Sequence, residues 1–322
     1  MTSRRLTVLL STPRIAPGLF TRDAWTALAG AAHVLTRDED ETQLNAIQLS
    51  GIAASHLGEQ EPAVLARLLV DRTYDGEVVW IGSADGDPGL TDALAAEVSS
   101  RQDPPEVEMI VGSYDVPGSR LLDLVAVMDR LRSPAGCPWD AEQTHESLVP
   151  YVIEETHELV EAIESGDRTH LLEELGDLLL QVMFHARIAQ EDNESPFGID
   201  EVAGGIVEKL VRRHPHVFAD AEDGGPTDPA GVAASWEQIK AAEKPHRTAP
   251  LDGIPKDLPA LARAHKAAGR LLTADRFDLA LAAAAHDDLG SRLFALVLEA
   301  REKGQDPESA LRATIRGLEG PN

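Results

Sequence analysis

The sequence predicts an α/β domain at the N-terminus, followed by an all-α helical bundle. Up to residue 115, short β-branched runs alternate with stretches of helical periodicity, which is typical of a mostly parallel sheet. Beyond Leu121 the apolar residues recur with a period near 3.6, so only helices are expected there. A third observation, a symmetric set of acids between 155 and 177, indicates that the bundle carries the chemistry.

Composition limits the classes of protein to consider. The 322 residues suffice for more than one domain, and 43% of them are hydrophobic. No apolar run approaches the roughly 20 residues of a membrane span, and the first run is too short for a signal peptide. The single cysteine, Cys137, fits a reducing cytoplasm, where we expect the protein. A net charge of −26 argues against nucleic-acid binding, but allows a small anionic ligand held through a metal.

The N-terminal domain is predicted to contain four strands with helices between them. We expect strands at 6–10, 33–35, 77–82 and 107–111, and helices at 22–32, 43–56, 61–72 and 91–100. The first strand runs into Ser11-Thr12-Pro13-Arg14 and not into a Gly-rich phosphate loop. The segments 6–35 and 86–95 resemble a shortened tetrapyrrole methylase domain that lacks the Gly-rich cofactor loop of that family. The resemblance therefore implies a degenerate, non-catalytic domain that serves as a scaffold or in interactions.

The bundle is organised around a predicted helical hairpin at 151–190. Its turn is Ser165-Gly166-Asp167. Gly166 can adopt the left-handed conformation that ends a helix, and Asp167 can cap the helix that follows. Two antiparallel helices joined by a short turn are therefore expected.

Four acids are placed symmetrically about Gly166. Glu158 and Glu174 each lie eight residues from it, and Glu155 and Asp177 each lie eleven residues from it. In an antiparallel hairpin, residues equally far from the turn lie level with each other. Two levels of paired carboxylates, one helical turn apart, should therefore face each other.

Successive residues of an α-helix are rotated by about 100°, and at this spacing the acids fall within the apolar stripes of both helices. An ionised carboxylate that faces a core is costly unless it is paired or metal-bound, and neither helix carries a lysine. A single ExxE motif is usually just a solvated acidic face. Four symmetric acids inside the stripes favour a metal site, and their hard oxygen ligands favour Mg²⁺, or Mn²⁺, over Zn²⁺.

A third helix, expected at 199–213, supplies positive charge. Lys209, Arg212 and Arg213 stand at i, i+3 and i+4, on one stripe. Solvated basic faces are common, but beside a metal site such a stripe is suited to binding phosphates. Trp139 and Trp236 are candidates for stacking on a base, although a tryptophan in a helical domain more often belongs to the core.

At this point the bundle can be compared with a known family. The segments GCPWDAEQTHESLVPYVIEETHELVEAI, LLEELGDLLLQVMFHARIAQE, VEKLVRRHPHVFAD and WEQIKAAEK resemble the MazG family of nucleoside triphosphate pyrophosphohydrolases. The resemblance is specific over 120–250. It implies metal ligands at Glu155, Glu158, Glu174 and Asp177, phosphate-binding residues at Lys209, Arg212 and Arg213, and a base-contacting tryptophan at Trp236.

The resemblance also implies a reaction. A nucleoside triphosphate and water would give the monophosphate and pyrophosphate with the help of Mg²⁺, in a role that clears non-canonical or damaged nucleotides. Glu154, at the edge of the stripe, is our candidate for positioning the water. We expect a homodimer, because one hairpin cannot cover its own apolar face.

The domain bounds expected from the sequence are 1–115, 120–245 for the catalytic part, and 255–322. The last segment contains an internal echo, since 287–301 aligns with 173–187 at a constant offset of 114. In the echo Asp177 is replaced by Ser291 and Glu174 by Asp288. We interpret it as a second MazG-like repeat that has lost its ligands, or else as chance similarity between two leucine-rich helices.

Two other classes of protein share some of these features. Glu154-x-x-His157 matches half of a ferritin-like di-iron signature, but the partner helix has no second ExxH, and His157 points away from the carboxylate face. A helical interaction protein with a structural Mg²⁺ is the non-enzymatic alternative. The basic stripe at 209–213 argues against it, because a structural metal site does not need phosphate-binding residues.

Overall fold

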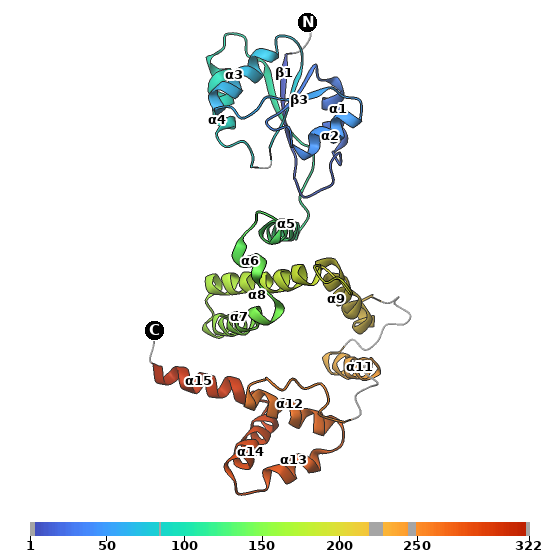
Figure 1. Cartoon of the computed structure of the whole chain (residues 1–322), viewed down its shortest axis with the longest axis vertical. Coiled ribbons are helices and arrows are strands. Elements are labelled where there is room, and N and C mark those ends of the chain that lie inside the picture. The colour runs from blue at the N-terminus through green and yellow to red at the C-terminus, as the bar shows by residue number, and fades with distance from the viewer. Residues whose placement is uncertain (1–3, 84, 219–227, 244–248, 320–322) are drawn as a thin grey trace. The chain divides into compact units, whose positions relative to one another are not determined.

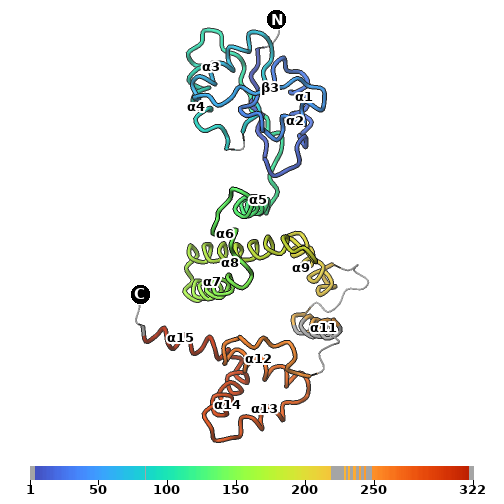
Figure 2. Tube along the Cα trace, viewed as in Figure 1, coloured from blue at the N-terminus to red at the C-terminus, as the bar shows by residue number. Residues whose placement is uncertain are grey.

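The computed structural model describes residues 4–83, 85–218, 228–243 and 249–319. The chain divides into two compact units, Met1–Ala203 and Gly204–Asn322, and each is described by itself. Figure 2 traces the chain through both. The division lies within the helix at 199–213, whereas the three domain ranges expected from the sequence stay a prediction.

The first unit begins with a five-stranded parallel sheet of strand order β3-β2-β4-β1-β5. This confirms the parallel α/β class for the N-terminal part. The strands are β1 (Arg5–Leu10), β2 (His33–Thr36), β3 (Ala54–His56), β4 (Val78–Ile81) and β5 (Glu106–Val111). The helices between them are α1 (Arg22–Gly30), α2 (Thr42–Leu49), α3 (Pro62–Arg72) and α4 (Leu90–Ser100).

Alternation along the strands divides the core into two layers. Leu6 and Trp80 are fully buried on the face that α3 and α4 cover, and Leu9 and Ile81 are fully buried on the face that α1 and α2 cover. Successive strand residues point to opposite faces, so both faces of this sheet must be apolar. The helices accordingly lie on both sides of the sheet (Figure 1).

The predicted C-terminal end of one helix was wrong. The helix expected at 43–56 stops at Leu49, and Ala54–His56 forms β3, which pairs with β2 in parallel at the edge of the sheet. Gly51 follows the helix with a φ of +88°, a left-handed conformation that turns the chain. The three-residue strand is too short to show a periodicity of two.

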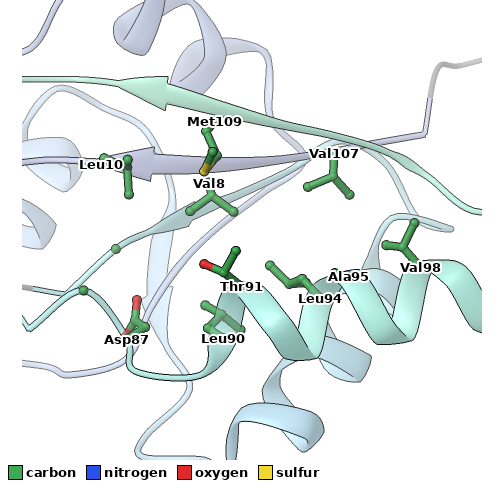
Figure 3. A pocket seen from close by; sticks show the side chains of 12 residues that line it. Val8, Leu10, Asp87, Leu90, Thr91, Leu94, Ala95, Val98, Val107 and Met109 are labelled. Atoms are coloured by element: carbon green, nitrogen blue, oxygen red, sulfur yellow. The ribbon is translucent and has the colours of Figure 1, made fainter.

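A cavity of about 340 Å³ lies between α4 and the strands β1 and β5. Its walls are apolar, with Leu94 of α4 beneath Val8 and Met109 of the strands (Figure 3). The charged residue of the lining, Asp87, already accepts hydrogen bonds from Trp80 Nε1 at 2.8 Å and from the Ser83 amide at 3.1 Å. This cavity therefore offers no unpaired charge to a ligand.

The rest of the first unit is helical. The helices are α5 (Arg120–Arg132), α6 (Pro138–Glu142), α7 (His145–Ser165), α8 (Arg168–Ala189) and the start of α9 (Ile199–Arg213). Met128 of α5, Leu148 of α7, and Met183 and Phe184 of α8 form the buried centre of this bundle. Of the helices in the described ranges, none is both long and apolar enough to cross a membrane.

The second unit contains the remaining helices: α10 (Pro215–Phe218), α11 (Pro229–Ala242), α12 (Ala260–Thr273), α13 (Phe277–Ala284), α14 (Leu289–Glu302) and α15 (Pro307–Glu319). Asp288 is the N-cap of α14 and accepts a hydrogen bond from the Ser291 amide at 3.0 Å. Its counterpart in the echo, Glu174, lies well inside α8. The echo therefore covers α14 but not the first turns of α8.

Candidate functional site

The frame of the site is the α7–α8 hairpin. Thr144 caps α7 in a reciprocal capping box with Ser147. Gly166 ends α7 with a φ of +76°, and Asp167 caps α8 by accepting from the Thr169 amide at 2.8 Å. Both roles expected for the turn residues are confirmed. The local sequence of the turn therefore sets which residues of the two helices lie level.

Three of the four symmetric acids meet across this hairpin. One carboxylate oxygen each of Glu155, Glu158 and Glu174 lies within 4.8 Å of the other two. Their exposure is graded, because Glu174 is 6% exposed, Glu155 is half-buried and Glu158 is exposed. Such a cluster presents oxygen ligands from a buried wall towards solvent, which suits a hard cation such as Mg²⁺.

The electrostatics of the cluster also point to a cation. Burial, and then the negative charges of Asp177, Glu158, Glu174 and Glu154, raise the pKa of Glu155 above its usual value. Like charges held this close oppose ionisation unless positive charge is added. The residues present therefore fit a divalent cation.

Glu174 supplies a second, independent observation. Its Oε1 lies 2.9 Å from His170 Nε2, one turn earlier on α8. Its Oε2 is buried and has no hydrogen-bond partner among the described residues. Buried acceptors without a partner are uncommon and need an explanation, and an ion at the cluster provides one.

Asp177 and Glu154 flank the three clustered acids. Asp177 does not share the 4.8 Å cluster, but its charge is the largest electrostatic contribution to the raised pKa of Glu155. Glu154 is exposed beside Glu155 on α7.

The basic residues of the expected phosphate-binding stripe belong to the second unit. Lys209 is exposed on α9. Arg212 Nη2 lies 2.9 Å from Glu243 Oε1, and Arg213 makes a charge-assisted hydrogen bond to the same carboxylate. The bond from Arg213, above all, lowers the pKa of Glu243 to about 2. A phosphate would have to compete with Glu243 for both arginines.

Both candidate tryptophans are exposed, contrary to the usual core role. Trp236 of α11 is 40% exposed, and Lys240 Nζ lies 4.7 Å from its ring centroid. Trp139 of α6 is 52% exposed and contacts Tyr151 edge to face, with ring centroids 6.2 Å apart. Trp139 belongs to the same unit as the acids.

Four residues at or near these groups were not predicted as site residues: His170, Glu243, Tyr151, and His185, whose ring stacks on that of His145 with centroids 5.0 Å apart. The spacing of His170 and Glu174, i and i+4 on one helix, was a usable signal. The contacts of Glu243 with Arg212 and of His145 with His185 join separate elements, so the spacing of residues along one helix does not predict them.

Comparison with known proteins now identifies the family. Residues 143–218 match the MazG nucleotide pyrophosphohydrolase domain, a range that contains the four acids and the basic residues of α9 but neither tryptophan. The chain is 51% identical over 251 residues to a 26.1 kDa protein of Streptomyces cacaoi, which covers 74% of this chain and all of that protein.

Several relatives carry a functional name, and two of them illustrate the range of coverage. A nucleoside triphosphate pyrophosphohydrolase of Mycolicibacterium smegmatis is 42% identical over 259 residues, 77% of this chain and 75% of that protein. One of Escherichia coli K12 is 48% identical over 146 residues, 44% of this chain and 54% of that protein. The chain thus spans about half the length of the E. coli relative, but three quarters of the M. smegmatis relative. This chain belongs to the MazG nucleotide pyrophosphohydrolase family.

Proposed function

We propose that this chain hydrolyses nucleoside triphosphates, or their deoxy forms, to the monophosphate and pyrophosphate. The carrying observation is the acidic cluster of Glu155, Glu158 and Glu174, with a buried, unpartnered oxygen on Glu174, inside the range that matches the MazG domain. The names of the relatives support the same reaction. Packing alone does not explain three converging carboxylates.

Mg²⁺, with Mn²⁺ as a substitute, is the proposed cofactor. Glu155, Glu158, Glu174 and Asp177 would hold it. When bound, it would supply positive charge to the phosphate oxygens and offset the charge that develops as the bond breaks. A cation bound there would lower the cost of the repulsion among the four carboxylates.

The remaining steps fall to the chain's own residues. Glu154, exposed beside Glu155, positions a water and accepts its proton as the water oxygen attacks the α-phosphorus. The bond between that phosphorus and the bridging oxygen breaks, and pyrophosphate leaves with the electron pair. Lys209, Arg212 and Arg213 bind the phosphates, and Trp236 and Trp139 contact the base.

We also propose that the protein works as a homodimer. Large apolar residues more than half exposed lie on both helices of the hairpin, namely Ile153 and Ile163 on α7 and Leu172 and Leu175 on α8. A monomer rarely leaves such a face in water. A second copy of the hairpin has the same apolar face to offer.

The other parts of the chain would have supporting roles. The N-terminal domain, 1–115, would be a degenerate tetrapyrrole methylase-like scaffold, in keeping with its apolar cavity. Residues 255–322 would be a MazG-like repeat without metal ligands, and 120–245 the catalytic domain. The substrates in the cell would be non-canonical or damaged nucleotides.

The test is product analysis of the purified full chain with a panel of ribonucleoside, deoxyribonucleoside and oxidised triphosphates. We expect monophosphate and pyrophosphate in equal amounts with Mg²⁺ or Mn²⁺, and neither with a chelator. Orthophosphate as the first product would refute the site of cleavage. Mg²⁺ binding without turnover of any triphosphate would favour the non-enzymatic interaction protein.

A further inference from the structure

Two large aromatic side chains are exposed and in contact, and one of them, Tyr151, lies one helical turn before Glu155 on α7. Trp139 is 52% exposed and Tyr151 is 39% exposed, and their rings meet at an interplanar angle of 83°. Exposed aromatic side chains in mutual contact are typical of binding surfaces, because they bring a large apolar area at little entropic cost. We refer to them as the Trp139–Tyr151 pair.

Tyr151 shares a helical stripe with the acids. Tyr151, Glu155 and Glu158 stand at i, i+4 and i+7 on α7, so their side chains leave the helix on one side. Four residues of α-helix rise about 6 Å. A triphosphate whose α-phosphate lies at the cluster therefore has its sugar and base within reach of Tyr151.

The backbone that presents Trp139 is unusually tightly held. A Cβ at Gly136 would lie 2.3 Å from the carbonyl oxygens of both Arg130 and Leu131, so no larger residue fits there without a shift. Ala135, just before it, has a φ of +65°, which L-residues rarely adopt. Such strained segments concentrate at functional sites, where the surrounding structure maintains them.

A buried arginine completes the support. The side chain of Arg132 is only 4% exposed, and it donates hydrogen bonds to the backbone carbonyls of Asp140 and Gln143, the latter at 3.2 Å. It also pairs with Glu191 at 2.8 Å. These contacts tie the end of α5 to the backbone that follows Trp139 in and just after α6, so its exposed ring is placed by a rigid scaffold.

From this arrangement we infer that the nucleobase of the triphosphate stacks on the ring of Tyr151 and is bordered by the ring of Trp139, which stands nearly perpendicular to it. Tyr151 is then the residue that directs the nucleoside along α7. The inference rests on the proposed function, since it takes the phosphates to lie at the acids. A planar aromatic surface stacks on any base, because every base has a π-face. The pair therefore confers preference for a nucleoside over bare polyphosphate, and little preference among bases.

The test is equilibrium binding by titration calorimetry with excess Mg²⁺. The two probes are α,β-methylene-ATP, whose cleavable bridging oxygen is replaced by carbon, and inorganic tripolyphosphate, which has no base. For Tyr151→Leu and Trp139→Leu we expect about tenfold weaker binding of the ATP analogue, within the roughly 5- to 150-fold effect of losing one stacked base. Binding of tripolyphosphate should stay within twofold of wild type.

Two variants serve as controls. Tyr151→Phe keeps the ring and should bind the ATP analogue as wild type does. If the hydroxyl group of Tyr151 were responsible for binding, this variant would instead be as weak as Tyr151→Leu. Tyr114→Leu removes another exposed tyrosine, in the α/β part, and should change neither affinity.

The outcomes separate the inference from the proposed function. Equal affinity of wild type and Tyr151→Leu for the ATP analogue would overturn the inference, as would an equal loss for analogue and tripolyphosphate. The latter result would mean that the pair only supports the fold or a subunit interface. A wild-type protein that binds neither probe would overturn the proposed function itself.

Discussion

Glu155→Gln should make the metal-free protein more stable while abolishing its activity. In the absence of a cation, burial and then the negative charges of Asp177, Glu158 and Glu174 raise the pKa of Glu155. Glutamine has almost the same shape as glutamate and carries no charge. The substitution therefore removes repulsion in the folded state with little change in packing.

The magnitude follows from the geometry. Two unit charges 4.8 Å apart repel by about 0.9 kcal/mol at the dielectric constant of water, and by about 3.5 kcal/mol at an effective value of 20. Glu155 takes part in two such interactions, with Glu158 and Glu174. Even the weaker figure gives a gain of about 2 kcal/mol in the free energy of unfolding, a rise of about 4–8 °C in melting temperature.

The assay is thermal unfolding with a chelator and again with excess Mg²⁺. In the chelator, Glu155→Gln should melt above wild type. With Mg²⁺, wild type should gain stability because the folded state alone binds the ion, whereas the variant should gain much less and release no pyrophosphate. The matched control is Glu161→Gln, an exposed position on the same helix, which should leave both melting temperatures and activity unchanged.

A clear result would refute this reasoning. If Glu155→Gln melted below wild type in the chelator, the carboxylate would stabilise the fold by itself, and no cation would be needed to explain the cluster. Full activity of the variant would remove Glu155 from the metal ligands.

Three further outcomes are expected. Asp177→Ala should abolish pyrophosphate release, whereas Asp288→Ala should only remove a helix cap, with a small loss of stability and with activity retained; equal loss of activity in both would contradict the degenerate repeat. Because the pKa of Glu243 is lowered from 4.5 to about 2, its ion pairs should stabilise the second unit above pH 4.5 and be lost as the pH falls towards 2. Hydrogen exchange of α9 and α11 should show this loss in wild type and not in Glu243→Gln. Burial and the charge of His145 lower the pKa of His185, so the unfolded chain binds a proton at this imidazole more readily than the folded chain does. The melting temperature should therefore decrease as the pH drops below about 6.5. The fall should be smaller in His145→Gln, and an equal fall would exclude the histidine pair as its cause.

Features with a local cause were predicted well. The hairpin turn needed only the conformational freedom of Gly166 and the capping side chain of Asp167, and both roles are confirmed. The bounds of α9, at 199–213, also agree with the expected helix. Strand β3 was missed because three residues carry no period, and its pairing with β2 depends on a neighbour far along the chain.

At the candidate site, local and long-range features separate in the same way. Helical spacing and symmetry about one turn are sufficient to bring Glu155, Glu158 and Glu174 together, because α7 ends and α8 begins at that turn. The grading of burial across these acids was not predictable, since it depends on which other helices pack around the hairpin. The unpartnered Oε2 of Glu174 is a consequence of that packing.

By itself, then, the sequence determined the two fold classes, the hairpin and the carboxylates that meet across it. These follow from the backbone preferences of single residues and from periods of two and 3.6. Only the tertiary structure decided that Arg212 and Arg213 are paired with Glu243, and that Trp139 is held against Tyr151. Each of those contacts joins separate elements, and its formation depends on how whole helices bury their apolar faces, which no local pattern records.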